Sequence, residues 1–368
     1  MQIKFLIINF LIMNKLKSLL LVCLLIGATV FLGCDNKEDE EYIEVDELLA
    51  LEPNMYLVGS LSGKNNIAKL WKSGESINLT NGTYDACANS IYVSGNDVYI
   101  AGIENTNKET AVNGYSTNYF AKQWKNGTAQ NLTDGTLDAR ANSVFVSGND
   151  VYVAGQIDTD YSRFAVLWIN GEEQYHGEGV ANSVYVSGNE VYVAGSRWLP
   201  NKQTRAVLWK DGEAQYFTDG SEATSVFVSG GNVYVAGYEK VEGVNNTYVP
   251  KLWINGETQN ISTGIESSQI SAAWSVFVSG SDVYVCGNIA DAQRNRYARL
   301  WKNGVEQTLA DDKSEESVAL SVIVKGSDVY VLGFGMKNNG AIRGKVWKNG
   351  EVKTFPGNVQ VLGMFIVD

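Results

Sequence analysis

The stretch NSVYVSGNEVYVAG (182–195), followed by RAVLWKDGEAQYFT (205–218), decides the fold. Val, Tyr, Phe and Trp dominate its runs, which is typical of β-strands. The turns SGNE and KDGE interrupt these runs, and their Gly-Asn and Asp-Gly pairs accept the positive φ angles of tight hairpin turns. The stretch therefore predicts two successive β-hairpins.

The same unit recurs along the chain. A tryptophan before the second turn marks seven copies, 41 to 53 residues apart: Trp71, Trp124, Trp168, Trp209, Trp253, Trp301 and Trp347. A four-stranded propeller blade takes about 40–50 residues, and residues 50–368 lack useful helical periodicity. We expect an all-β fold, a seven-bladed β-propeller of four-stranded antiparallel blades. The repeated Trp, and the Tyr of each VYVAG segment, should pack between blades.

The two ends of the chain complete one unit. There are seven second hairpins but only six first hairpins. The missing hairpin is split between MYLVG (55–59) at one end and MFIV (364–367) at the other. If these two strands pair, the ring closes and leaves no exposed edge strand. This split favours a closed ring over an open solenoid, whose terminal repeats would act as caps.

The N-terminus carries a secretory signal. Lys15 and Lys17 precede an apolar run, Leu19–Leu32, which is too short to span a membrane. The ending Phe31-Leu32-Gly33-Cys34 resembles the lipobox of bacterial lipoproteins, which implies that Cys34 carries the lipid; the alternative is an ordinary cleaved signal. Met13 would give a more usual signal length than Met1.

An acidic segment, DNKEDEEYIEVDE, follows Cys34. It contains too few apolar residues to fold, which indicates a tether. We therefore expect a signal peptide at 1–33, a disordered tether at 34–50 and the propeller at 51–368. The run from Lys37 to Glu41 also resembles the export signal of surface lipoproteins in Bacteroidota, although a generic solvated linker fits equally well. These features predict a bacterial outer membrane location, facing the cell surface, with the lipid as the only membrane contact.

The net charge of −12 argues against nucleic acid as a partner. Removal of residues 1–33 takes away three lysines and no acid, which leaves a charge near −15. We expect a monomer.

The sequence predicts no cofactor, no metal site and no catalytic residue. Outside the first 34 residues only Cys87, Cys286 and His176 offer thiol or imidazole groups, without the clustering that zinc needs. The two cysteines fall in non-adjacent units, so we expect no disulfide between them. The single histidine lies in GEEQYHGEG, which predicts an exposed loop, and the motifs GxSxG, HExxH and GK[ST] are absent. The acidic stretch ADDKSEES (310–317) lacks calcium-ligand spacing.

Variable loops on a rigid scaffold are where function usually resides. The short turns of every unit should share one end of the blades, and the longer, variable connections should share the other end. The longer connections between the two hairpins of a unit include 156–163, 196–204, 238–249 and 288–297, and those between blades include 134–141, 176–181 and 262–273. Aromatic and arginine side chains in or beside these connections are the candidate ligand-binding residues: Trp198, Trp274, Arg197, Tyr238, Tyr297 and Arg140.

Two recurrent polar motifs have simpler explanations. Asn89, Asn142 and Asn182 recur in ANS; they either line the channel mouth or cap a turn with their own backbone, and we expect the turn role. Asp85 and Asp138 occupy matching positions in adjacent units, so a loop-forming role is expected rather than glycoside hydrolysis.

The repeat W-K-N-G followed by S-V-x-V-S-G-N-D-V-Y-V-A-G resembles repeats of uncharacterised surface lipoproteins in Bacteroidota, over residues 54–368. The resemblance implies a propeller and no particular activity.

We expect a non-enzymatic binding module that captures a glycan, because aromatic rings stack on sugars while amides and charges bind hydroxyls. An interaction platform for an envelope or adhesion protein is the alternative, since Trp, Tyr and Arg are enriched at protein hot spots. A hydrolase or lyase that uses loop carboxylates is the third hypothesis.

Overall fold

The computed structural model describes residues 52–105, 119–199, 203–241, 247–259, 261, 271–291, 293–307, 309–310, 315–337, 341–355 and 359–367. All of them belong to one compact unit, Glu41–Asp368. The expected signal peptide (1–33), the expected lipid site at Cys34 and the expected tether (34–50) lie outside the described residues.

Within these residues the chain forms 27 β-strands in six antiparallel sheets, five with four strands and one with seven. The seven-stranded sheet holds two four-stranded units that share strand β11, so the sheets make up seven units, called blades 1 to 7. From the innermost strand outward, blades 1 and 2 are β27 (Val359–Ile366), β1 (Met55–Leu61), β2 (Ile67–Lys72) and β3 (Glu75–Asn78), then β4 (Ala86–Ser94), β5 (Asp97–Asn105), β6 (Tyr119–Lys125) and β7 (Thr128–Asn131).

Blades 3 and 4 form the seven-stranded sheet: β8 (Asp138–Ser147), β9 (Asp150–Asp158), β10 (Arg163–Ile169), the shared β11 (Glu172–Ser187), β12 (Glu190–Trp198), β13 (Thr204–Lys210) and β14 (Glu213–Tyr216). Blade 5 is β15 (Glu222–Ser229), β16 (Asn232–Lys240), β17 (Tyr248–Ile254) and β18 (Glu257–Gln259). Blade 6 is β19 (Ala272–Ser279), β20 (Asp282–Ala290), β21 (Arg296–Lys302) and β22 (Val305–Gln307). Blade 7 is β23 (Glu316–Lys325), β24 (Asp328–Met336), β25 (Ile342–Lys348) and β26 (Glu351–Thr354).

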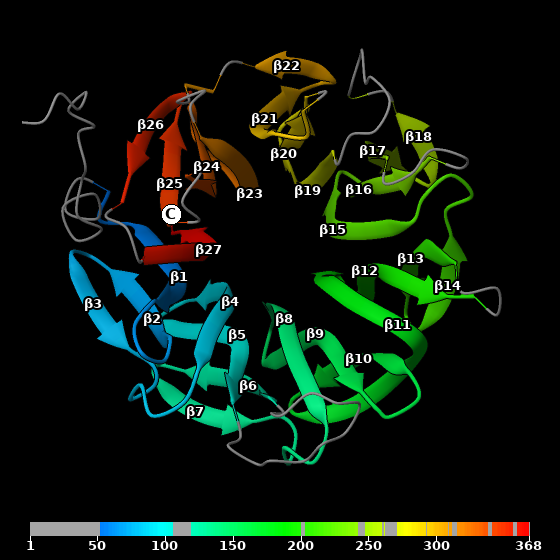
Figure 1. Cartoon of the computed structure of the whole chain (residues 1–368). Coiled ribbons are helices and arrows are strands. Elements are labelled where there is room, and N and C mark those ends of the chain that lie inside the picture. Colours follow the sequence, from blue (N-terminus) through cyan, green and yellow to red (C-terminus); the bar gives the residue numbers. More distant parts are fainter. Residues whose placement is uncertain are drawn as a thin grey trace, which may run out of the picture. The chain divides into compact units, whose positions relative to one another are not determined.

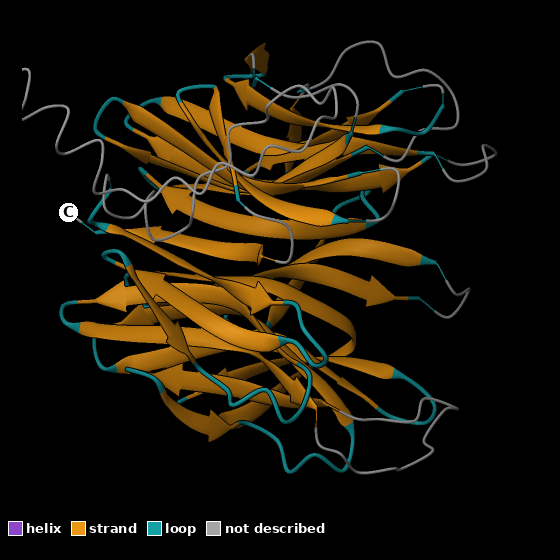
Figure 2. Ribbon diagram, turned by 60° about the vertical axis from the view of Figure 1, so that its left-hand side comes forward, coloured by secondary structure: helices purple, strands orange, loops and turns teal. Residues whose placement is uncertain are grey.

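The innermost strands encircle a central axis (Figure 1). They contact one another in the order β27, β4, β8, β11, β15, β19, β23 and back to β27. Strand β27 also pairs with β1, with Met55 opposite Ile366 and Leu57 opposite Met364. The β-propeller expected from the sequence is therefore present, and both its seven units and the pairing of its two ends agree with the expectation. Figure 2 shows the twisted sheets of successive blades packed side by side.

Each innermost strand carries a β-bulge at one repeated position. The register shifts between Ala88 and Ser90, and at the matching place in β8, β11, β15, β19 and β23. A bulge leaves one residue unpaired and re-aims its side chain. Asn89 uses this freedom to donate its side-chain amide to the carbonyl of Ala141 in the next blade, 2.9 Å away, and Asn142 and Asn182 do the same one blade further on.

The expected turn role of these three asparagines is therefore wrong. The bulge points their side chains at the neighbouring blade, where a backbone carbonyl is already placed to accept. Ser90 adds a second bond by accepting from the N–H of Val144. Side chains of the bulge thus connect one blade to the next.

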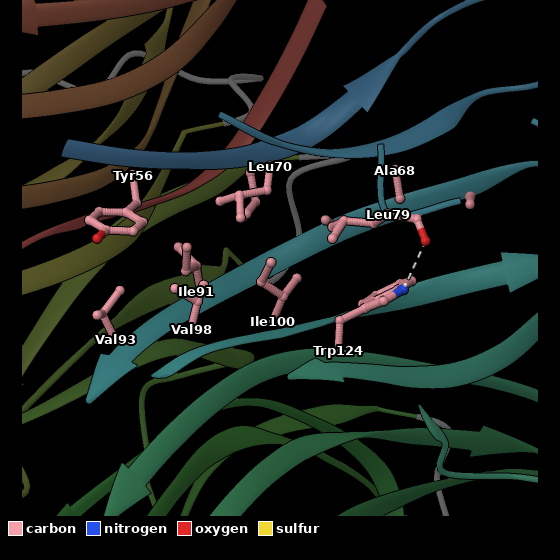
Figure 3. Close-up of a cluster of buried hydrophobic side chains, with 12 residues drawn as sticks. Tyr56, Ala68, Leu70, Leu79, Ile91, Val93, Val98, Ile100 and Trp124 are labelled. Atoms are coloured by element: carbon pink, nitrogen blue, oxygen red, sulfur yellow. Dashed lines mark hydrogen bonds between the residues drawn. The ribbon is translucent and has the colours of Figure 1, made fainter. Parts of the chain in front are cut away.

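The repeated tryptophans lie in the core between blades, as expected. Trp124, Trp168, Trp209, Trp253, Trp301 and Trp347 are among the largest fully buried side chains. Figure 3 shows Trp124 beneath Leu70, Leu79 and Ile100, with its indole N–H donated to the carbonyl of Leu79.

The end of the blades that carries the short hairpin turns is called the turn face, and the opposite end is called the loop face. On the turn face, positive φ angles of Asn126 and Gly127 (50° and 80°) form the tight second turn of blade 2. Asn126 also accepts from the N–H of Val98 and donates to Asp97, and four other blades repeat both bonds. Polar groups of this face therefore satisfy one another.

One predicted connection is a strand instead of a loop. The segment 176–181 lies inside β11, which runs without interruption from the outer edge of blade 3 to the innermost position of blade 4. His176 and Ala181 lie only five positions apart, whereas the equivalent Leu132 and Ala141 lie nine apart. The shorter segment leaves no residues for a loop, and Gly177 and Gly179, with φ of 99° and 148°, make the change of direction.

Candidate functional site

All six candidate binding residues lie near the loop-face ends of strands rather than in loops. Arg140 is in β8, Arg197 and Trp198 end β12, Tyr238 is in β16, Trp274 is in β19 and Tyr297 is in β21. Five of them are paired with a neighbouring strand, whereas Trp274 is the residue that the bulge of β19 leaves unpaired between Ala273 and Ser275. Backbone pairing therefore fixes the positions of the other five.

Two of the candidates meet between blades 5 and 6. The rings of Tyr238 and Trp274 pack edge to face with centroids 6.1 Å apart, and Tyr238 packs the same way on Tyr248 at 5.5 Å. Trp274 occupies the bulge position that carries Asn in blades 2 to 4, and its indole N–H donates to Asn288 at 2.9 Å. These rings are half-buried, and the indole N–H is already satisfied.

Tyr238 also donates its hydroxyl to Glu222, whose other oxygen accepts from Asn182 at 2.9 Å. Burial, together with the negative charge of Glu222, raises the pKa of Tyr238 well above its usual value. The phenol therefore stays protonated and serves as a donor. This network connects blades 4, 5 and 6.

The other pair of candidates, Arg197 and Trp198, lies at the junction of blades 3 and 4. Trp198 is 36% exposed, and the Arg163 guanidinium lies over its ring, 5.9 Å from the centroid. Arg197 donates to the hydroxyl of Tyr216 at 2.6 Å. We call Arg163, Arg197, Trp198, Arg205 and Tyr216 the seam cluster.

Arg163 belongs to the seam cluster through a bidentate pair. Its Nε and one terminal nitrogen each donate to a different oxygen of Asp158, both at 2.7 Å. Hydrogen bonding to Asp158 raises the pKa of Arg163, and the charges of Asp158, Asp138 and Glu222 add to the effect.

The exposed aromatic side chains are concentrated on blades 3 and 4. Among the described residues five aromatic side chains are exposed, and only Tyr84 lies elsewhere; the others are Tyr161, Tyr175, Trp198 and Tyr216. Sequence reasoning did not single out Tyr175 and Tyr216. Both stand seven residues after the repeat Trp, where the other units carry Asn or Thr, so a full alignment of the repeats would have found them.

The remaining two candidates have other surroundings. The Arg140 guanidinium lies over the ring of Tyr119 at 5.5 Å and approaches Asp138 at 3.7 Å. The hydroxyl of Tyr297 donates to Asp291 at 3.2 Å. Among the described residues, no hydrogen bond, ion pair or ring contact joins Arg140 or Tyr297 to the seam cluster or to the Tyr238–Trp274 pair. The six candidates therefore do not form a single site.

The paired aspartates have the loop-forming role that the repeat predicted. Asp85 accepts from the backbone N–H of Asn66, and Asp138 accepts from that of Tyr119, at 2.8 and 3.0 Å. Burial raises the pKa of Asp138. Each carboxylate thus connects an interblade segment to the third strand of a blade.

His176 does not lie in an exposed loop as expected. It is half-buried in β11, with its ring edge to face on Trp209 at 5.5 Å. Its position, eight residues after the repeat Trp, is an inward apolar position in the other units, filled for example by Leu79 and Phe217. The imidazole therefore replaces an apolar packing residue.

Cys87 and Cys286 are free thiols. In the part of the chain that the structure describes, no group of three or more His, Cys, Asp or Glu could hold a metal ion. Nor does that part contain a helix with the length and apolarity needed to cross a membrane. An open depression of about 510 Å³ lies between blades 1 and 2. Its lining contains no aromatic side chain and consists of Asn78, Leu79, Thr80, Asn81 and Glu104.

The chain matches no protein-family profile, and no curated protein is similar to it. Among solved structures it is similar to the β-propeller domain of the Trilobed protease from Pyrococcus furiosus, with a TM-score of 0.49 and 11% identity over 84% of this chain and 96% of that one. It is also similar to a Mycobacterium tuberculosis puromycin-hydrolyzing peptidase (0.42, 11%, 74% of this chain and 53% of that chain) and to Trypanosoma rangeli sialidase (0.44, 12%, 73% and 55%). The chain spans about half the length of these last two proteins, and at such identities the likeness concerns the fold alone.

Proposed function

We propose that this protein is a non-enzymatic binding module that captures a glycan on the loop face, with Trp198 as the ring on which the sugar stacks. The observation that carries the proposal is the concentration of exposed aromatic side chains on blades 3 and 4, four of the five among the described residues. An exposed indole beside charged and hydroxyl groups offers a sugar both a stacking surface and hydrogen-bond partners.

One contrast supports the loop face over the turn face, and a second supports Trp198 over the other candidates of the loop face. The turn-face asparagines and aspartates bond one another in five blades, so their groups are already satisfied. The Tyr238–Trp274 pair is half-buried with its N–H and O–H groups engaged. Trp198 presents more of its ring to solvent, and it is the better candidate for direct contact.

The second part of the proposal is a lipid anchor at Cys34. It holds the propeller outside the cytoplasm, on the outer membrane and facing the cell surface. The lipobox-like ending at Cys34 and the acidic segment behind it support this part. Mass spectrometry of the mature N-terminal peptide tests the anchor: an unmodified N-terminus at another residue would contradict it. Protease accessibility on intact cells tests the surface location.

The glycan proposal is tested by screening the purified full-length chain against soluble polysaccharides and a glycan array. Trp198→Ala should weaken binding by about tenfold or more, because loss of one aromatic platform removes about 1.5 kcal/mol or more. Tyr84→Ala is the matched control, since Tyr84 is equally exposed at 36% but lies between blades 1 and 2.

Equal binding by wild type and Trp198→Ala would move the site away from blade 4. Absence of binding to every sugar would contradict the glycan proposal and favour a protein partner, because exposed Trp, Tyr and Arg also form protein hot spots. Crosslinking in the envelope would then identify that partner.

A further inference from the structure

The arginines of this chain are segregated on one face. Seven of the eight lie in the loop-face half of a strand or in a loop-face connection, from Arg140 in β8 to Arg343 in β25, and Arg299 lies at the middle of β21. The lysines that directly follow the repeat Trp, such as Lys125 and Lys302, lie beside the turn-face carboxylates, whereas other strand lysines, such as Lys122, pair with acids elsewhere. The planar guanidinium fork binds carboxylates and sulfates through two parallel hydrogen bonds. This distribution therefore favours an oxyanion ligand at the loop face, despite the net negative charge of the protein.

Two of these arginines face one another without a neutralising acid. Arg197 in β12 stands directly opposite Arg205 in β13. Arg163, Arg296 and Arg299 each form an ion pair at 2.7 or 2.8 Å, but among the described residues no carboxylate pairs with Arg197 or Arg205. Like charges directly opposite on neighbouring strands are destabilising. The pair therefore lowers the stability of the unliganded protein, and a bound anion would remove that repulsion.

The junction of blades 3 and 4 is crossed by a strand rather than by a loop, and both arginines are half-buried there. Because β11 runs directly from one blade to the next, no interblade loop lies over the seam (Figure 1). Arg197 lies against Gly177, where an added Cβ would meet the guanidinium at 3.1 Å. On its other side, Arg197 donates to Tyr216, and the exposed ring of Trp198 follows it in the chain.

We propose that Arg197 and Arg205 bind the oxyanion of an acidic glycan, a uronate carboxylate or a sulfate ester, whose sugar ring stacks on Trp198. The proposal rests on the proposed function, and it names the ligand class. Arg163 does not supply this charge because Asp158 already neutralises it. Arg197 and Arg205 supply two positive charges and several N–H donors. The hydrogen bond to Tyr216 fixes the orientation of the Arg197 guanidinium.

The test uses the purified full-length chain and calorimetric titration with two matched pairs of probes. Oligogalacturonate is compared with its methyl ester, which keeps the sugar ring but removes the charge, and dextran sulfate oligosaccharides are compared with dextran. We expect one acidic member to bind at least about tenfold more tightly than its neutral counterpart. The pair that shows this difference identifies carboxylate or sulfate as the oxyanion.

Arg197→Gln and Arg205→Gln should each weaken binding of the acidic probe by about tenfold and leave the neutral probe unchanged. Arg296→Gln is the control, because it removes the same charge from an arginine that is already paired with Glu316. The melting temperature of Arg197→Gln and Arg205→Gln should stay equal or rise, since each variant relieves the repulsion between the two arginines. A merely structural arginine would give the opposite change.

Four outcomes would overturn the inference. Equal binding of acidic and neutral probes that Trp198→Ala abolishes would leave the proposed function standing and remove only the oxyanion site. An equal loss of acidic-probe binding in Arg296→Gln would mean that the overall charge of the protein, and not the Arg197–Arg205 pair, causes the effect. A large fall in melting temperature in Arg197→Gln would assign that residue to structure. Binding to none of the four probes, combined with an empty glycan array, would contradict the proposed function as well.

Discussion

At the scale of the residue, His176 is the departure from the repeat with the clearest physical consequence. It fills a position at which other units place Leu or Phe, and its ring packs on Trp209. Desolvation lowers the pKa of His176 below its ordinary value of 6.5. The unfolded chain therefore takes up a proton at a higher pH than the folded chain does. Stability from this residue is fully present above pH 6.5 and falls as the pH drops through that value.

His176→Phe should remove this pH dependence, because phenylalanine occupies the same position at Phe217 and Phe355. We expect the free energy of unfolding to rise by about 1 kcal/mol at pH 8 from additional apolar burial, and to rise further at pH 5. Urea unfolding at both pH values measures the change. Since His176 is the only histidine in the chain, the difference between variant and wild type isolates its titration. An identical gain at both pH values would mean that the imidazole is equally solvated in the two states.

At the scale of the element, the strands could be predicted because they repeat. Each blade packs on the next through the same side chains, so Trp124 and its counterparts recur at one spacing and reveal the unit. The bulges could not be predicted, because a bulge depends on which residues pair across two strands. This is why the side chains of Asn89 and Asn142 were expected to bond locally, although they bond the next blade.

The candidate site was predicted only in part for the same reason. Trp198 and Arg197 break the repeat and stand out in the sequence. The opposition of Arg197 and Arg205 becomes visible only when the register of β12 and β13 is known. The absence of a loop at 176–181 was likewise missed, because glycines next to a histidine are typical of loops as well as of a strand that changes direction.

Gly179 makes the passage of β11 between the two blades possible. An added Cβ would lie 2.0 Å from the carbonyl oxygen of Ser196, and φ at this residue is 148°. Gly179→Ala should therefore lower the free energy of unfolding by about 3 kcal/mol, and it should weaken ligand binding because Arg197 and Trp198 follow Ser196 in β12. Gly188→Ala in the same blade, with φ of 61° and open space around it, should lower stability by only about 1 kcal/mol. Equal effects in urea unfolding would show that β11 and β12 separate at this end without a penalty.

At the scale of the whole molecule, the aromatic side chains of the innermost strands reflect the symmetry of the propeller. Six of the seven innermost strands carry an aromatic ring at one matching position, and β23 carries Ile323 there. Each ring contacts the ring of the next strand from Phe365 through Tyr92, Phe145, Tyr185 and Phe227 to Phe277. Four successive pairs from Tyr92 to Phe277 have centroids 4.7 to 5.0 Å apart and interplanar angles of 47° to 50°. Seven equal steps around an axis would rotate each ring by about 51°. The side-chain geometry thus agrees independently with seven blades.

The closing strand β27 supplies one of these rings, so ring geometry and closure depend on each other. It buries Val361 and Met364 against Leu57 and Trp71, and Val367 adds a backbone bond to Asn54. Glu52, just before β1, accepts a hydrogen bond from the Tyr330 hydroxyl and forms an ion pair with Lys348, and both of these residues belong to blade 7. Removal of β27 would expose the edge of β1 along its whole length, and an exposed edge strand is a template for association with another chain.

Truncation after Phe355 should therefore lower the melting temperature and increase the size of the assemblies that the chain forms, measured by circular dichroism and by light scattering after size exclusion. A synthetic peptide of residues 356–368, added in excess, should restore both properties, because it can pair with β1 and return Val361, Met364 and Phe365 to their positions. A peptide in which Val361 and Met364 are replaced by Asp is the control, since it keeps the length but cannot enter the apolar core. Recovery with the control peptide would attribute closure to backbone pairing alone. A truncated chain that keeps the assembly state and the stability of the full chain would mean that the seven blades hold together through the contacts between their faces, without the strand that joins the two ends.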